Sequence, residues 1–178
     1  MKLVILDRDG VINYDSDQFI KSPSEWKPLP GSLEAIARLT HDGYRVVVAS
    51  NQSGIGRGLF DMDTLNAIHD KMHHAVQGLG GRINAIFYCP HTAESKCKCR
   101  KPKTGMFERI GTCFNTDLSE AYVIGDSLRD LSPGVAVGAR PILVLTGKGQ
   151  ITQRDNVLPE GTRVCADLAE AVEYILKS

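Results

Sequence analysis

Short apolar runs alternate with helical patterns along the chain. Five runs rich in β-branched and aliphatic residues have the length of strands: Leu3–Leu6, Tyr44–Ala49, Ile83–Tyr88, Ala121–Ile124 and Pro141–Leu145. Strands that alternate with helices are typical of βαβ units, in which the strands form a parallel sheet. We therefore predict an α/β fold with a doubly wound, mainly parallel sheet.

Three other segments have apolar residues at every third or fourth position, as one face of a helix requires. Their apolar positions are Leu33, Ile36 and Leu39 in the first, Leu65, Ile68, Met72, Val76 and Leu79 in the second, and Leu168, Val172 and Ile175 in the third. Asp167 and Glu170, at the start of the third segment, have the spacing of a capping box. The pattern predicts three amphipathic helices.

The amino-acid composition is typical of an ordinary globular domain. The 178 residues are 42% hydrophobic and 24% charged, with 21 basic and 21 acidic side chains. A chain of this length can bury a full core without disulfides, so we expect one domain over residues 1–178. Zero net charge gives no general attraction to nucleic acid or to anionic membranes. The first residues contain too few apolar positions for a signal peptide or a membrane span. We expect a cytoplasmic monomer with a small-molecule substrate.

Polar residues follow three of the predicted strands: Asp7, Ser50 and Asp126. Ligands of open α/β sheets bind at the carboxyl ends of the strands, so these side chains can meet there. Asp7 and Asp9 are two residues apart, and extended backbone points both carboxylates the same way. With Asp126 they form an oxygen-rich site suited to Mg²⁺, in which one carboxylate can attack phosphorus while another transfers a proton. Taken singly, each aspartate is more often a helix cap or a turn former.

Two further segments supply hydrogen-bond donors and positive charge for a phosphoryl group. Ser50-Asn51-Gln52-Ser53-Gly54 offers hydroxyl, amide and backbone N–H groups at a strand end, and Arg100-Lys101-Pro102-Lys103 offers fixed charge before a helix. Each segment alone is equally compatible with a plain polar loop or with a solvated run of charge.

The order of these motifs resembles that of the haloacid dehalogenase superfamily of phosphohydrolases. The matching residues are Asp7-Arg8-Asp9-Gly10, Ser50-Asn51, Lys101 and Gly125-Asp126-Ser127-Leu128-Arg129-Asp130. The resemblance implies that Asp7 is the nucleophile and Asp9 the general acid/base, and that Ser50 and Lys101 hold the phosphoryl group. It also implies Mg²⁺ bound by Asp7, Asp126 and the backbone carbonyl of Asp9. Whether Asp130 contacts the metal or only orients a neighbour is left open.

Cys89, His91, Cys97 and Cys99 form a second group, with the three thiols and one imidazole of a tetrahedral zinc site. The alternatives are reduced loop cysteines or a disulfide between Cys89 and Cys97. Zinc is favoured because free cysteines are usually buried, whereas lysine, glutamate and serine surround these. We expect a structural zinc loop over residues 89–99, which orders the basic segment that follows it.

The loop also makes the sequence resemble a narrower group, the D-glycero-D-manno-heptose 1,7-bisphosphate phosphatases, and less closely the histidinol-phosphate phosphatases. The matching segments are residues 7–13, 50–58 and 99–106. The first resemblance implies removal of the 7-phosphate during synthesis of nucleotide-activated heptose for lipopolysaccharide or other glycans; the second implies histidinol phosphate as the alternative substrate. By position, the implied substrate contacts are Asp15, Ser16, Asp17, Gln18, Asn51, Gln52, Ser53, Arg100 and Lys101, with Arg100 at the distal part of the substrate.

The gaps between the motifs are too short to contain a cap domain, so we expect an open site. A phospho-accepting signalling module remains an alternative of another class, although it has no need of Asp9. A zinc-ribbon nucleic-acid binder is disfavoured by the neutral net charge. Elsewhere, His69 and His73 are expected on a solvated helix face, and Cys113 and Cys165 in the core.

Overall fold

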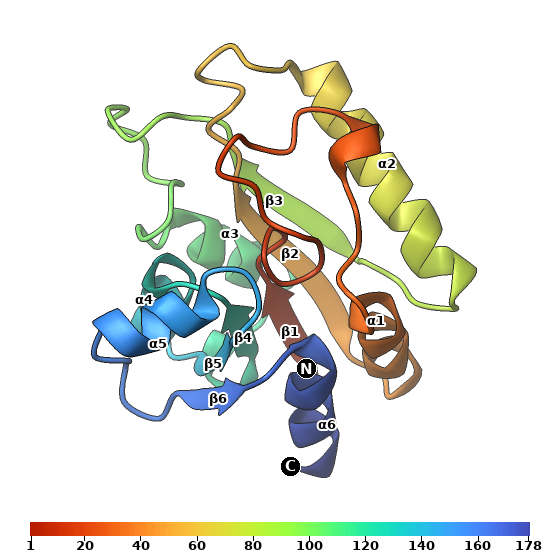
Figure 1. The fold of residues 1–178 in the computed structure, drawn as a ribbon. Coiled ribbons are helices and arrows are strands. Elements are labelled where there is room, and N and C mark those ends of the chain that lie inside the picture. Colours follow the sequence, from red (N-terminus) through yellow and green to blue (C-terminus); the bar gives the residue numbers. More distant parts are fainter.

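A computed structural model describes residues 1–178. Six strands form one sheet in the order β3-β2-β1-β4-β5-β6 (Figure 1). The strands are β1 (Leu3–Leu6), β2 (Arg45–Asn51), β3 (Ala85–Cys89), β4 (Tyr122–Gly125), β5 (Arg140–Val144) and β6 (Arg163–Cys165). All neighbouring pairs are parallel, which confirms the predicted fold class.

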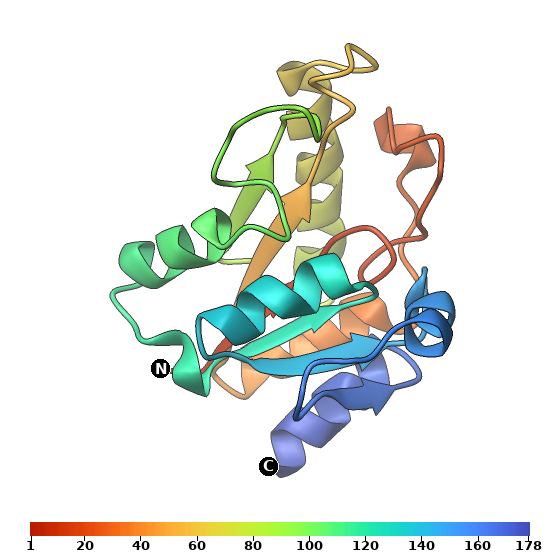
Figure 2. The ribbon, with the colours of Figure 1, turned by 90° about the vertical axis from the view of Figure 1, so that its left-hand side faces the viewer.

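Helices cover both faces of this sheet (Figures 1 and 2). They are α1 (Ser32–His41), α2 (Met62–Gly78), α3 (Gly105–Cys113), α4 (Leu128–Ala136), α5 (Gly149–Asp155) and α6 (Leu168–Lys177). Aspartate side chains cap the starts of two helices, and Asp167 was predicted in this role. The Asp61 side chain accepts from the Thr64 N–H at the start of α2, and the Asp167 side chain accepts from the Glu170 N–H at the start of α6.

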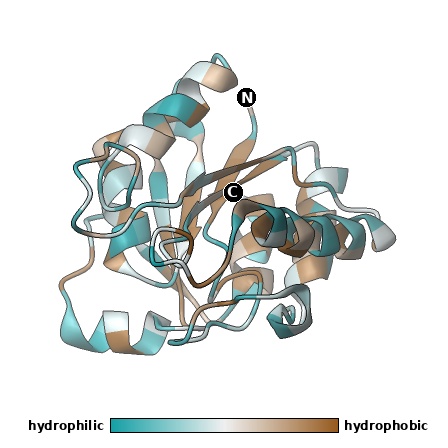
Figure 3. Cartoon of the chain, turned by 90° about the horizontal axis from the view of Figure 1, so that it is seen from above, coloured by the Kyte–Doolittle hydropathy of each residue, from teal (hydrophilic) through white to brown (hydrophobic).

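The alternation of side chains along the strands divides the core in two. In β1, Val4 and Leu6 pack with residues of α1, α2 and α6, whereas Leu3 and Ile5 pack with residues of α3 on the other face. Helix α4 lies on the α3 side, because Gly134 packs closely against Val123. Seen from above, the strands are coloured hydrophobic along most of their length and the helices carry both colours, as amphipathic helices should (Figure 3).

The predictions about these elements were wrong or incomplete at several points. Helices α4 and α5 were not predicted, nor was β6, whose three residues include only one β-branched side chain, Val164. Cys113 is exposed at the end of α3, although Cys165 is buried as predicted. His69 is buried in α2 and not solvated. None of the helices combines the length and the hydropathy that crossing a membrane demands.

The strand order places a binding crevice beside β1. The chain runs outward from β1 to β2 and β3, and then returns to the other side of β1 as β4. In open α/β sheets, ligands bind outside the carboxyl ends of the strands at such a reversal. Asp7 follows β1 and Asp126 follows β4, so both lie at the reversal. No cap domain is evident above them (Figures 1 and 2).

Candidate active site

Asp7 is paired with Lys101, which lies 94 positions later in the chain. Lys101 Nζ donates to Asp7 Oδ1 at 3.0 Å, to the Ala49 carbonyl at 2.7 Å and to Asp130 Oδ1 at 2.6 Å. These bonds occupy all three N–H groups of the ammonium, and only 2% of the residue is exposed. Burial favours the neutral amine, but Asp130 and Asp7 outweigh it and raise the pKa of Lys101. The lysine therefore stays charged and fixes the Asp7 carboxylate.

Two glycines make room for the Asp126 carboxylate. Gly10 and Gly147 both have positive φ, at +86° and +55°, and a Cβ atom on either would overlap Asp126 Oδ2. The Lys148 backbone N–H donates to the same oxygen at 2.8 Å, and Thr152 Oγ1 donates to the Asp126 carbonyl. The carboxylate is thereby held beside Asp7, as the motif predicts.

Both oxygens of Asp130 are bound to protein donors. Oδ1 accepts from Lys101, and Oδ2 accepts from the N–H and the hydroxyl of Ser127 at 3.2 and 3.0 Å. Asp130 thus caps the start of α4 and orients Lys101 in one arrangement. Of the two roles that the sequence left open for Asp130, this geometry favours orientation over direct binding of a metal.

The acidic cluster carries more negative than positive charge. Ligand oxygens of Asp7, Asp126 and Asp130 lie within 4.8 Å of one another. Three carboxylates and the one ammonium of Lys101 leave two negative charges. Burial, and next the charge of Asp130, raise the pKa of Asp7 to about 7 despite Lys101. Burial, followed by the charges of Asp7 and Asp130, raises the pKa of Asp126 to about 8. An all-oxygen site with two uncompensated charges fits one Mg²⁺ ion.

Asp9 is held by four donors instead of facing the cluster. Its oxygens accept from Arg8 Nε and a terminal Arg8 nitrogen at 2.9 and 3.1 Å, from Asn13 at 2.9 Å and from Gln52 at 3.2 Å. Burial would raise the pKa of Asp9, but the charge and hydrogen bonds of Arg8, with those of Asn13 and Gln52, hold it below its ordinary value. Asp9 therefore rests as a carboxylate. The predicted Mg²⁺ ligand at this position is its backbone carbonyl, which these contacts leave to that role.

The segment after β2 ties the two sides of the site together. The Asn51 amide donates to the Lys101 carbonyl and accepts from the Lys101 N–H, both at 3.0 Å. Asn51, Gln52 and Ser53 line the pocket, as expected of substrate-binding residues. Ser50 is buried behind them, and its hydroxyl accepts from the Gln52 amide at 2.8 Å. Direct contact of Ser50 with a phosphoryl group stays a prediction.

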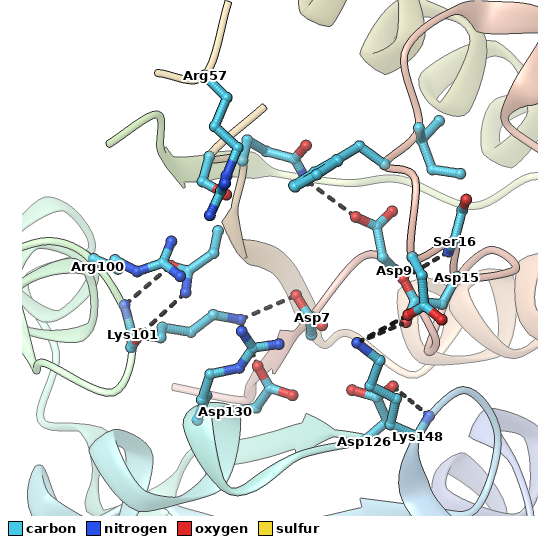
Figure 4. Close-up of a pocket in the computed structure, with 17 residues that line it drawn as sticks. Asp7, Asp9, Asp15, Ser16, Arg57, Arg100, Lys101, Asp126, Asp130 and Lys148 are labelled. Carbon is cyan, nitrogen blue, oxygen red and sulfur yellow. Dashed lines mark hydrogen bonds and ion pairs between the residues drawn. The ribbon is translucent and has the colours of Figure 1, made fainter. Parts of the chain in front are cut away.

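Cationic side chains surround the acidic floor (Figure 4). Asp7 lies at the centre of the view, with Lys101 and Arg100 on one side and Lys148 on the other. The cationic rim, as we call it, consists of Arg57, Arg100, Arg129 and Lys148. Such a rim suits an anionic ligand larger than a single phosphate.

The loop after Gly10 contacts two residues of the cationic rim, Lys148 and Arg57. Asp15 and Asp17 carboxylates lie 3.7 and 3.6 Å from Lys148 Nζ, and Phe19 lies against the Arg57 guanidinium, 5.8 Å from ring centroid to Cζ. Of the four residues of this loop that are predicted to contact substrate, Asp15, Ser16 and Asp17 line the pocket and Gln18 does not.

Several residues of the site were missed in the sequence analysis. Lys148 follows β5, so the rule used for Asp7, Ser50 and Asp126 could have found it: β5 was predicted, and Thr146-Gly147-Lys148 stands at its carboxyl end. Arg57 lies within a motif that was quoted, but no local signal shows that its side chain turns towards the pocket.

The four predicted zinc ligands come together in one cluster. Cys89 Sγ lies 3.8 Å from Cys97 Sγ, 3.1 Å from Cys99 Sγ and 3.4 Å from His91 Nδ1. The sulfurs are free thiols, so the alternative disulfide between Cys89 and Cys97 is not formed. A backbone hydrogen bond from Arg100 lowers the pKa of Cys97 to about 6, which favours the thiolate that a metal requires. The cluster could bind a metal.

The loop that carries this cluster is attached to the active site at two points. The Arg100 guanidinium donates to the His91 carbonyl at 3.3 Å. The Gly105 N–H donates to the Lys98 carbonyl at 3.1 Å, and a Cβ on Gly105 would overlap that carbonyl. The fold of the loop therefore determines where Arg100 and the start of α3 lie.

Comparison with known proteins agrees with this geometry. Residues 98–171 match the family described as HAD-hydrolase-like, and residues 2–131 match the family described as polynucleotide kinase 3 phosphatase. The chain is 56% identical to a D-glycero-beta-D-manno-heptose-1,7-bisphosphate 7-phosphatase of Bordetella bronchiseptica, over 99% of both chains. It is 53% identical to the enzyme of that name from Neisseria meningitidis, over 99% of this chain and 96% of the other.

A solved structure agrees as well. The D,D-heptose 1,7-bisphosphate phosphatase of B. bronchiseptica, complexed with magnesium and phosphate, superimposes with a TM-score of 0.98 at 56% identity and covers 99% of each chain. This agreement extends over nearly the whole chain and includes the sheet that carries the acidic cluster. The chain therefore belongs to the haloacid dehalogenase superfamily of phosphatases and, within it, to the family of the D,D-heptose 1,7-bisphosphate phosphatases.

Proposed function

We propose that this phosphatase removes the 7-phosphate of D-glycero-β-D-manno-heptose 1,7-bisphosphate through a phosphorylated Asp7. The observation that carries the reaction is the place of Asp7 at the reversal of strand order, with Lys101 bound to one oxygen and Asp126 beside it. The substrate and its anomer are supported by the names of the relatives, which cover nearly the whole chain.

In the first step, an Asp7 oxygen attacks phosphorus and the bond from phosphorus to the C7 oxygen breaks. Asp9 gives its proton to the leaving alkoxide. Since the resting contacts of Asp9 favour its ionised form, the side chain must take up a proton and release at least one of its four donors before this step. Mg²⁺, held by Asp7, Asp126 and the Asp9 carbonyl, offsets the repulsion between carboxylate and phosphate when bound.

In the second step, ionised Asp9 takes a proton from a water molecule as that water attacks the phosphorus of the aspartyl phosphate. The bond from phosphorus to the Asp7 oxygen breaks, which releases inorganic phosphate and restores the Asp7 carboxylate. Lys101 keeps this carboxylate in place through both steps, because its other two bonds, to Ala49 and Asp130, anchor it to the fold.

The cationic rim supports a substrate with two phosphates. A phosphate bound at Asp7 lies near the positive charge of Lys101 and leaves the rim side chains for a second anionic group. We propose that Arg100 contacts the distal part of the substrate and that Asp15, Ser16 and Asp17 bind sugar hydroxyls, since all of them line the pocket. Gln18 does not line the pocket and is not proposed as a substrate contact.

A phosphate-release assay with Mg²⁺ tests the assignment. It compares the β and α anomers of the heptose bisphosphate with histidinol phosphate and simple hexose phosphates. We expect the highest kcat/KM for the β anomer. A preference for histidinol phosphate would overturn the substrate and leave the mechanism standing. A long-lived phosphoprotein without release of phosphate would instead favour the signalling alternative.

We also propose that the metal of the Cys/His cluster is Zn²⁺ with a structural role. In a tetrahedral site with Zn–S bonds of about 2.3 Å, two sulfurs lie about 3.8 Å apart. The distances of 3.1 to 3.8 Å between the sulfurs here are close to that arrangement. The three sulfurs and the His91 nitrogen give four ligands without a water molecule, as in structural zinc sites.

Replacement of Cys97 by serine should lower the zinc content and the melting temperature, the latter by roughly 5 °C or more, because the metal no longer closes the loop. Activity should fall roughly tenfold as Arg100 and Lys101 lose their fixed positions. Elemental analysis, thermal melting and the phosphate-release assay measure the three effects. Cys113→Ser is the matched control, since Cys113 is exposed and outside the cluster. Full activity of zinc-free protein would show that the loop does not need the metal.

The stabilisation by Mg²⁺ should increase with pH. Because the folded-state pKa values of Asp7 and Asp126 are raised, to about 7 and about 8, these groups stabilise the metal-free fold at acid pH, and their contribution is lost as the pH rises through those values. Protons compete with Mg²⁺ for the same oxygens. Thermal melts with and without Mg²⁺ should therefore differ little near pH 5 and most near pH 9. A constant difference would count against this site, and Asp126→Asn should abolish the dependence.

A further inference from the structure

A buried histidine lies behind the proposed acid/base residue. His69, in α2, is 6% exposed, and its Nε2 atom lies 3.1 Å from a terminal nitrogen of Arg8. Arginine can only donate hydrogen bonds, so Nε2 must accept, and the imidazole is neutral with its proton on Nδ1. Burial, with the charge of Arg8, lowers the pKa of His69 to about 3, in agreement with a neutral ring.

Arg8 connects this histidine to Asp9. The arginine is fully buried, and each edge of its guanidinium has a partner. Nε and one terminal nitrogen donate to the two oxygens of Asp9, that terminal nitrogen also faces the Gln52 carbonyl oxygen at 3.3 Å, and the other terminal nitrogen donates to His69. A planar guanidinium with partners at both ends has one orientation, in which Nε and one terminal nitrogen both point at Asp9.

The Gln52 side chain is aligned by the same group. Because its carbonyl oxygen accepts from Arg8, its NH₂ group faces Asp9 Oδ2 at 3.2 Å and Ser50 Oγ at 2.8 Å. A displaced Arg8 would therefore release Asp9 both directly and through Gln52. His69 is the partner that holds Arg8 from the side remote from the pocket, since His69 is buried and does not line the pocket.

We infer that His69 is a positioning residue for the phosphatase reaction: as a neutral hydrogen-bond acceptor it fixes Arg8, and through Arg8 it places the Asp9 carboxyl for proton transfer to the leaving group. This inference rests on the proposed function, in which Asp9 is the general acid/base. It assigns to an α2 residue, 60 positions from Asp9, a role in one chemical step and not in substrate binding.

Two substrates with different leaving groups can distinguish this positioning role of His69 from a purely structural role. A sugar alkoxide needs a proton as it leaves, whereas p-nitrophenolate leaves without one. The value of kcat/KM reports the steps up to departure of the leaving group, so it excludes the later hydrolysis of the aspartyl phosphate. Misplacing Asp9 should lower kcat/KM for the heptose bisphosphate and leave kcat/KM for p-nitrophenyl phosphate nearly unchanged.

The experiment compares His69→Leu, which removes the acceptor, with His69→Gln, whose carbonyl oxygen can replace it. In His69→Leu we expect kcat/KM for the heptose bisphosphate to fall about tenfold to 100-fold, a range that a displacement of about 1 Å can produce. The value for p-nitrophenyl phosphate should stay within about twofold, and His69→Gln should recover most of the loss. His73→Leu, a half-buried histidine of the same helix with no bond to Arg8, is the matched control and should behave as wild type.

Asp9→Asn distinguishes failure of this inference from failure of the proposed function. In the Asp9→Asn background, His69→Leu should cause no further loss, because it acts through the group already removed. Equal losses on both substrates in His69→Leu and His69→Gln, or unchanged kinetics in His69→Leu while Asp9→Asn loses the sugar substrate, would overturn the role of His69 alone. If Asp9→Asn itself keeps wild-type kinetics on the sugar substrate, the assignment of Asp9 fails and the inference fails with it.

Discussion

Replacement of Asp7 by asparagine should stop phosphate release, with kcat lowered by a factor of about 10⁴ or more. The amide has nearly the same shape, but it is not a nucleophile for phosphorus, and the carboxylates of Asp9 and Asp130 are held by other groups. Asp130 is bound to Lys101 and Ser127, and Asp9 to Arg8. The loss should therefore be in the chemical step, while Mg²⁺-dependent binding of substrate is partly kept.

The stability of the Asp7→Asn variant gives an independent check. Since burial and Asp130 raise the pKa of Asp7, its charge is unfavourable in the metal-free protein at neutral pH. Removing that charge should leave the metal-free melting temperature unchanged or higher. Asp63→Asn, on the exposed surface at the start of α2, is the control for loss of one carboxylate. Appreciable turnover by Asp7→Asn would refute nucleophilic catalysis by this residue.

Replacement of Lys101 by methionine should damage both activity and stability. Removing one partner of a buried ion pair typically costs about 3 to 5 kcal/mol, because the remaining charge is left without compensation. Here two carboxylates, Asp7 and Asp130, lose their shared cation, and the Ala49 carbonyl loses its donor. We expect a large fall in melting temperature and a loss of turnover of about 10³-fold, since the nucleophile loses its partner and the phosphoryl group loses a nearby positive charge.

Mg²⁺ separates the two effects in the Lys101→Met variant. A divalent cation can offset part of the charge left in the acidic cluster, so it should restore part of the stability but little of the activity. Lys98→Met, an exposed lysine of the same loop, should keep both. If Mg²⁺ restored full turnover to Lys101→Met, the lysine would be a structural residue only.

Much of the active site was predictable because its main residues follow apolar strands. Asp7 and Asp126 stand directly after strands whose β-branched and aliphatic residues are unambiguous, and the parallel order brings them together. The four ligands of the Cys/His cluster were predictable for a different reason: they lie within eleven positions, so their meeting does not depend on the rest of the fold.

Other parts of the site depend on contacts between distant segments. Arg129 reaches the pocket from the first turn of α4 and Arg57 from the segment after β2, and no local pattern gives the direction of either side chain. His69 was misplaced for a reason that the sequence contains. It stands four residues after Leu65 and next to Ile68, on the buried face of α2, but its spacing from His73 suggested a solvated pair. The position of His69 on the apolar face of α2 predicts its burial better than its spacing from His73 does.

The cationic rim also affects how fast substrate arrives. Opposite charges attract over a distance set by the ionic strength, about 10 Å at 0.1 M salt. Arg57, Arg100, Arg129 and Lys148 stand around the mouth of the pocket, and no domain screens them from the solvent. Once Mg²⁺ compensates the charge of the acidic cluster, they can steer a phosphorylated sugar into the pocket before any specific contact forms. Capture of the substrate, and with it flux at low substrate concentration, becomes sensitive to the salt content of the surrounding medium.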